Sequence, residues 1–180
     1  MASMRRLLDA LYLGCGWLAA VFLGGICILM LSQALLREFD VLIRGADDLT
    51  AWFCAASAFL ALPHTFKYGD LVRVGLLLDS LSERVRRYFE IFSLGIAAWF
   101  VGYMTCAVGS YVFESWQLNE VAQGLIKVPL WMPQMSFLVG SAVFLIAIVD
   151  ELILVLRRRK PTYRVAAEER LARGDFSETV

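Results

Sequence analysis

The chain has 180 residues and no net charge at neutral pH, with 59% hydrophobic residues, 19% charged residues and a mean hydropathy of +0.65. Soluble domains are roughly 45–50% apolar and about 25% charged, so the composition excludes a water-soluble fold, a disordered chain and a disulfide-rich secreted scaffold. The balanced charge also predicts that no nucleic acid is bound.

Four segments without Asp, Glu, Lys or Arg make up 90 of the 180 residues: 10–36, 49–66, 91–113 and 128–149. Because a helix rises about 1.5 Å per residue, segments of 18 to 27 residues can cross a hydrocarbon core of roughly 30 Å. We therefore predict an all-α integral membrane protein with one domain over residues 1–160 and a polar cytoplasmic tail over 161–180. Its transmembrane helices are expected at about 10–36, 47–67, 89–113 and 133–156.

An amphipathic helix is predicted between the second and third spans, at about residues 70–87. Its apolar residues recur at steps of three and four, and most charged residues fall on other faces. Such a segment is too short and too charged to span, and it fits a helix lying at the cytoplasmic interface. Two interpretations stay open: a brace that docks on a partner or on lipid, or a surface helix that covers its own bundle.

Small residues recur at four-residue spacing in the first and third spans: Gly16, Ala20 and Gly24, then Ala98, Gly102, Cys106 and Ser110. Such spacing lets helix backbones approach closely in lipid. The small residues could pack inside the four-helix bundle or face another membrane protein, and their number favours the second interpretation.

The loop before the fourth span combines tryptophan and proline, with Trp116, Pro129 and Trp131 close together. Tryptophan favours the headgroup region and proline restricts the backbone, so we expect a fixed re-entry into the membrane here. At the far end of the fourth span, Asp150 and Glu151 are expected to reach the interface and pair with basic residues of the tail.

The distribution of Lys and Arg predicts the orientation. Placing both termini and the second loop in the cytoplasm puts 14 of these residues inside and 3 outside. The basic cluster at 157–160 then lies among anionic lipid headgroups.

The residues that support catalysis or cofactor binding are sparse. His64 is the single histidine, and we expect an interfacial residue there rather than a haem ligand or a proton relay. The four cysteines all lie within spans without a C-x-x-C pair, and no phosphate-binding loop occurs. We predict no enzyme activity, no cofactor and no metal. Because the central thirds of the spans carry no charged residue, the chain alone is not expected to move a polar solute.

An ordered set of motifs resembles the small membrane subunit (DctQ-type) of tripartite ATP-independent periplasmic (TRAP) transporters, over about residues 10–157. The motifs are an Arg after the first span, paired acids opening the second, the 67–74 turn, the 128–133 segment and Gly140. The turn resembles the family's Arg-x-Gly-x-His-Ile-Arg-Val and contains Arg73. Leu71 replaces the usual His there, and Gly75 stands where an Asp is common.

The resemblance implies a fixed scaffold in the bacterial inner membrane. In this family a large multi-span subunit carries the substrate and sodium sites and moves like an elevator. A periplasmic substrate-binding protein delivers an organic acid. The expected partners of this chain are therefore those two proteins and membrane lipid.

Residue patterns and resemblance together give these candidates for a partner interface: Arg37, Asp47, Asp48, Arg73, Gly102, Glu114, Trp116, Glu120, Lys127, Pro129 and Trp131. For Asp47 and Asp48, helix capping is as good an explanation as partner contact, and Arg37 is a candidate ion-pair partner for one of them. A stand-alone four-span transporter or channel is the alternative function, and a subunit of a respiratory complex is a third.

Overall fold

The computed structural model describes residues 2–68, 82–124 and 126–157. It contains four long helices: α1 (Ala2–Arg37), α2 (Ala46–Tyr68), α4 (Glu83–Gln117) and α5 (Trp131–Leu156). All four are long and apolar enough to cross a membrane, which confirms the predicted all-α class with four spans.

Two helices extend well beyond the predicted spans. α1 begins at Ala2 rather than near residue 10, and α4 begins at Glu83 rather than near 89. Charged residues end a hydrophobic run but do not end backbone hydrogen bonding, because long side chains can reach water from a helix that continues past the hydrocarbon. Residues 83–87 of the predicted interfacial helix therefore belong to α4. Residues 70–81 of that prediction, including Arg73, lie outside the described residues, as does the predicted tail over 161–180, and Ser82 directly precedes α4.

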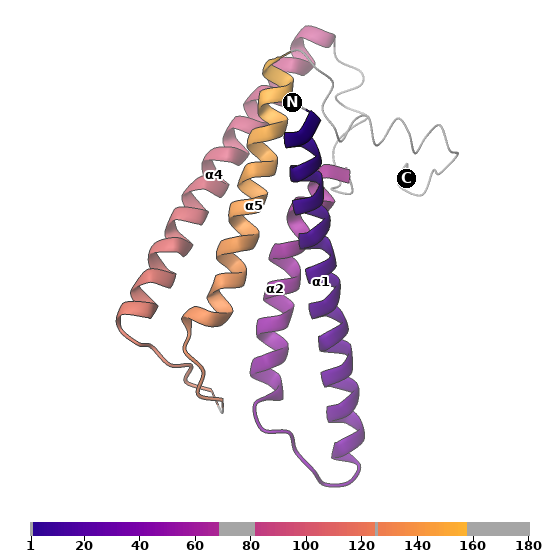
Figure 1. The fold of residues 1–180 in the computed structure, drawn as a ribbon, viewed down its shortest axis with the longest axis vertical. Coiled ribbons are helices and arrows are strands. Elements are labelled where there is room, and N and C mark those ends of the chain that lie inside the picture. The colour runs from indigo at the N-terminus through magenta and orange to yellow at the C-terminus, as the bar shows by residue number, and fades with distance from the viewer. Residues whose placement is uncertain (1, 69–81, 125, 158–180) are drawn as a thin grey trace, which may run out of the picture.

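The helices form a row in the order α1, α2, α5, α4 (Figure 1). Each packs mainly on its neighbours in this row, and α1 touches α5 only slightly. α5 lies inside the row and holds the largest share of buried residues, among them Ile148, Ala147 and Val155. Edge-to-face aromatic pairs join α2 to α5, such as Phe66 with Phe144 at 5.5 Å between ring centroids.

The contact between α2 and α5 is closest at Gly140. A methyl group built on Gly140 would lie 2.7 Å from the carbonyl carbon and oxygen of Phe59. Glycine is therefore the residue that lets these two helix backbones meet, as small residues do in membrane helix pairs. The next residue, Ser141, is fully buried, and its hydroxyl donates to the carbonyl of Leu138 at 3.1 Å.

The chain crosses the long dimension of the molecule four times, so α1 begins at the same end at which α5 finishes (Figure 1). We call this the N/C end. The opposite end, which carries residues 38–45 and 118–130, is the loop end.

Candidate functional site

The connection between α4 and α5 at the loop end is a hairpin held by backbone hydrogen bonds. Val121 forms an antiparallel bridge with Pro129, the amide of Ala122 donates to the carbonyl of Val128 at 2.9 Å, and that of Leu130 donates to the carbonyl of Glu120 at 2.9 Å. At its base, the buried hydroxyl of Ser115 donates to the carboxylate of Glu120 at 2.9 Å. We call residues 118–130 the loop-end hairpin, within which residue 125 is not described.

The loop-end hairpin lies directly on the start of α2. A methyl group on Gly124 would lie 2.1 Å from a carboxylate oxygen of Asp48, and one on Gly45 would lie 2.2 Å from Cγ1 of Ile126. Gly45 also has a φ of +82°, in the left-handed region that favours glycine. The two connections of the loop end therefore interlock through close contacts at Gly124 and Gly45, and at Gly45 the backbone and Ile126 together disfavour a larger residue.

The structure separates the two acids that open α2. Asp47 is exposed and accepts a hydrogen bond from the Gln33 side chain of α1 at 3.3 Å. Asp48 is half-buried against Gly124 of the loop-end hairpin. Within the described part of the chain, Arg37 is exposed and forms no ion pair with either acid. The side chain of Gln33, rather than that of Arg37, contacts Asp47.

The other candidates at this end divide into exposed and half-buried residues. Glu114, Trp116, Glu120 and Lys127 are exposed, whereas Pro129 and Trp131 are half-buried where α5 begins. The carbonyl of Pro129 accepts the amide of Met132 at 3.1 Å, which places this proline directly before the helix. The exposed charges and the exposed Trp116 can therefore contact a partner.

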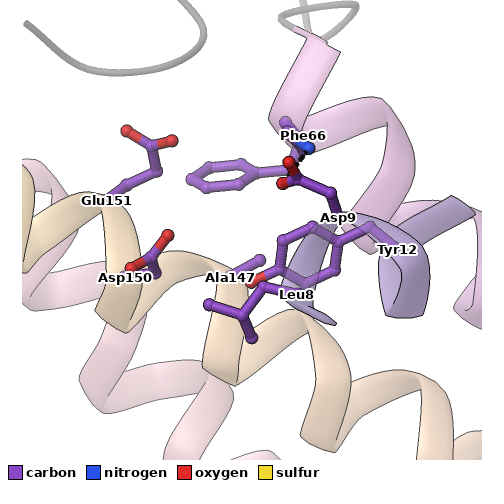
Figure 2. Close-up of a pocket in the computed structure, with 8 residues that line it drawn as sticks. Leu8, Asp9, Tyr12, Phe66, Ala147, Asp150 and Glu151 are labelled. Atoms are coloured by element: carbon purple, nitrogen blue, oxygen red, sulfur yellow. Dashed lines mark hydrogen bonds and ion pairs between the residues drawn. The ribbon is translucent and has the colours of Figure 1, made fainter. Parts of the chain in front are cut away.

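The N/C end holds a charged cavity that the sequence patterns did not single out. It has a volume of about 190 Å³ and is lined by α1, α2 and α5 (Figure 2): Leu8, Asp9, Tyr12, Phe66, Lys67, Ala147, Asp150 and Glu151. Lys67 forms an ion pair with Asp9, and its ammonium lies 5.6 Å from the centroid of the Tyr12 ring.

Glu151 is buried near the end of α5. Only 3% of this residue is exposed, and it lines the cavity. Arg157 forms no ion pair with it among the residues that the structure describes, and 158–160 lie outside them, so the pairing with the basic cluster stays a prediction. In the sequence, the signal for this cavity was the pair Asp150 and Glu151 in the last turns of an apolar helix. The lining residues from α1 and α2 are distant in sequence, so no pattern connects them to this pair.

One polar contact ties α4 to α5 at the N/C end, and an ion pair lies beside it within α4. A guanidinium nitrogen of Arg87 donates to the carbonyl of Leu156 at 3.0 Å, satisfying one of the orphan acceptors at the end of α5. Arg86 forms an ion pair with the buried Glu90 one turn along, at 3.4 Å. Neither contact was expected from the sequence.

The small residues divide between packing and surface. A methyl group on Gly16 would lie 3.1 Å from the ring of His64, and one on Gly102 would lie 3.8 Å from Leu145. Gly102 thus lies half-buried where α4 meets α5, and its place in a partner interface stays a prediction. The exposed members of the two series are Ala20, Gly24, Cys106 and Ser110.

No group of His, Cys, Asp or Glu side chains suited to a metal ion occurs in the described ranges. The four cysteines are free, and three of them, Cys27, Cys54 and Cys106, are exposed on the helices. The described helices therefore have polar residues at the N/C end and the loop end, and apolar side surfaces between these ends.

Comparison with known proteins gives one family. The model of the tripartite ATP-independent periplasmic transporters, DctQ component, matches residues 26–158. No curated protein matches the chain.

Proposed function

This chain belongs to the DctQ component family of tripartite ATP-independent periplasmic transporters, and from that premise we propose that it is the small scaffold subunit of a sodium-coupled transporter for an organic acid. It is a multi-pass membrane protein of a transport system. Its role is to hold a large elevator-type subunit in place in the bacterial inner membrane. Its loop end helps to dock the periplasmic substrate-binding protein.

The interlocked loop end is the observation that carries this proposal. A docking face beside a moving subunit needs a fixed shape, and precise positioning of contact residues requires a rigid support. The loop-end hairpin is held by backbone hydrogen bonds and by the close contacts of Gly124 with Asp48 and of Gly45 with Ile126. Glu114 and Lys127 lie exposed at this end.

The placement of charge also supports a scaffold role. The charged residues of α1, α2, α4 and α5 lie near the helix ends, and the middle of each helix is apolar. A polar or charged solute needs compensating groups near mid-membrane, which this proposal assigns to the large subunit.

Charge reversal at the loop end tests the docking role. We expect Glu114→Lys or Lys127→Glu to lower uptake that depends on the binding protein roughly two- to fivefold, the range for exposed charge pairs. Recovery of the membrane complex should be unchanged. Arg84→Glu, an exposed reversal at the N/C end, is the matched control and should leave uptake unaltered. Equal uptake by all three variants would remove the loop end from the docking face.

Reconstitution tests the scaffold role itself. Liposomes that contain this chain alone should take up no organic acid, whereas liposomes with both membrane subunits and the binding protein should do so. Uptake by the chain alone would establish a stand-alone transporter instead.

A further inference from the structure

One exposed stripe along α4 has a regular period. Its members are Phe92, Ile96, Trp99, Tyr103, Cys106 and Ser110, and all six are exposed. The spacing alternates between four and three residues, so the six residues follow one face of the helix. We call this set the α4 stripe.

The α4 stripe points away from the rest of the molecule. α4 is the last helix of the row and packs on α5 through its other side, where Leu94 and Val112 are buried. No other described helix covers this face.

Polar atoms in the middle of the α4 stripe argue for protein rather than lipid. Trp99 and Tyr103 lie near the midpoint of α4, and they are 69% and 70% exposed. Among the described residues neither the Trp99 indole nor the Tyr103 hydroxyl has a hydrogen-bond partner, and their rings stack at 6.4 Å. Tryptophan and tyrosine normally lie at the membrane interfaces, and a donor left without an acceptor in hydrocarbon is costly. A protein can supply the acceptor, whereas lipid tails cannot.

The opposite edge of the row provides the contrast. The outward face of α1 is aliphatic in the half nearer the loop end, with Val21, Ile28, Leu31 and Leu35 exposed, whereas Trp17 is exposed on the same face nearer the N/C end. Such a face is satisfied by lipid tails. The aliphatic half of α1 and the α4 stripe therefore differ in the kind of neighbour that they fit.

The surface beside the α4 stripe has room for projecting side chains. A groove of about 410 Å³ is lined by Ile91, Phe92, Gly95, Ile96, Trp99 and Phe100. A methyl group on Gly95 would meet nothing within 4 Å, so the groove is open at this glycine. A ridge on a second helix can enter such a groove.

We propose that the α4 stripe seats one transmembrane helix of the large membrane subunit, which supplies a hydrogen-bond acceptor beside Tyr103. This inference rests on the proposed function, which makes that subunit the membrane partner. The stripe changes in size along α4, from aromatic rings at Phe92, Trp99 and Tyr103 to the small Cys106 and Ser110. A second copy would place large against large and small against small, whereas a different helix can have the complementary gradient.

Photo-crosslinking in the intact complex tests the contact. Tyr103 is replaced by p-benzoylphenylalanine, with Ile28 on the outward face of α1 as the matched control position. Irradiation should join the Tyr103 position to the large subunit and leave the Ile28 position without a protein adduct. An adduct to a second copy of this chain, or a large-subunit adduct at Ile28 but not at Tyr103, would overturn the assignment.

A pair of cysteine substitutions provides the second arm, because each edge helix has one exposed cysteine. Cys106→Trp should reduce recovery of the large subunit with this chain at least about tenfold, since a bulky group forces the packed helices apart. Cys27→Trp should leave recovery unchanged. Equal recovery with both would show that the α4 stripe is not the contact. If the unaltered chain recovers no large subunit, the proposed function fails; if only the Cys106 effect is missing, the proposed function stands and this face is wrong.

Discussion

At the scale of single residues, Gly45 carries two separate constraints. Its φ of +82° disfavours any residue with a Cβ, and the place where that atom would sit is occupied by Ile126. Gly45 thus joins the first connection to the loop-end hairpin, although the two are some eighty residues apart in the chain.

We predict that Gly45→Ala destabilises the protein. The left-handed backbone costs about 1–2 kcal/mol with a Cβ, and the collision with Ile126 adds to this. The midpoint of thermal unfolding in detergent should fall by roughly 2–4 °C for each kcal/mol.

Two further variants separate the causes. Gly45→Ala with Ile126→Ala should recover only part of the loss, because it removes the collision but not the backbone strain. Gly24→Ala is the control, since a methyl group there meets nothing within 4 Å. An unchanged midpoint in Gly45→Ala would contradict the interlock.

Sequence reasoning at this scale found the right segment but not the contacts. It singled out Glu120, Lys127 and Pro129, and the structure places them in one hairpin. It could not distinguish Asp47 from Asp48, because the two residues are identical and adjacent. Their surroundings differ only in the fold, where Asp48 lies against Gly124 and Asp47 contacts Gln33. It also missed Asp9 and Tyr12, which join Glu151 only through tertiary packing.

At the scale of helices, the existence of each span followed from hydropathy, and its ends did not. The run without charges underestimates α1 and α4 because both helices continue through charged turns. The small-residue spacing was an ambiguous signal, because it marks close approach without naming the neighbour. The structure assigns Gly102 to the α4–α5 contact and leaves Cys106 exposed.

Two glycines in neighbouring helices make a matched prediction. Gly140→Ala should lower stability by about 1–3 kcal/mol, because its methyl group would lie 2.7 Å from the Phe59 backbone and force α2 and α5 apart. Gly102→Ala should be tolerated, since its methyl group would make an ordinary contact with Leu145 at 3.8 Å. Thermal unfolding of both variants in the same detergent gives the comparison, and similar losses would refute the difference in packing.

At the scale of the whole molecule, the order of the helices lay beyond the sequence patterns. Chain order would place α4 beside α2, but α5 lies between them and packs on both. Hydropathy identifies which segments are apolar, but it does not predict which helix faces pack together. The packing depends on the fit of side chains and small residues, as where Gly140 lies against Phe59.

The orientation is a prediction for the molecule as a whole. If the N/C end is cytoplasmic, as the ratio of 14 to 3 basic residues indicates, a membrane-impermeant maleimide should label Gln123→Cys in spheroplasts. Ser82→Cys, exposed at the other end, should react only after permeabilisation. The reverse pattern would invert the topology and remove the loop end from the periplasm.

The row of helices has one more consequence. A channel through the membrane needs a closed ring of helices. Here α1 and α4 lie at opposite edges of one row, with α2 and α5 between them. The described helices therefore form a wall. Any watery passage that runs along this wall has to take its remaining sides from another polypeptide.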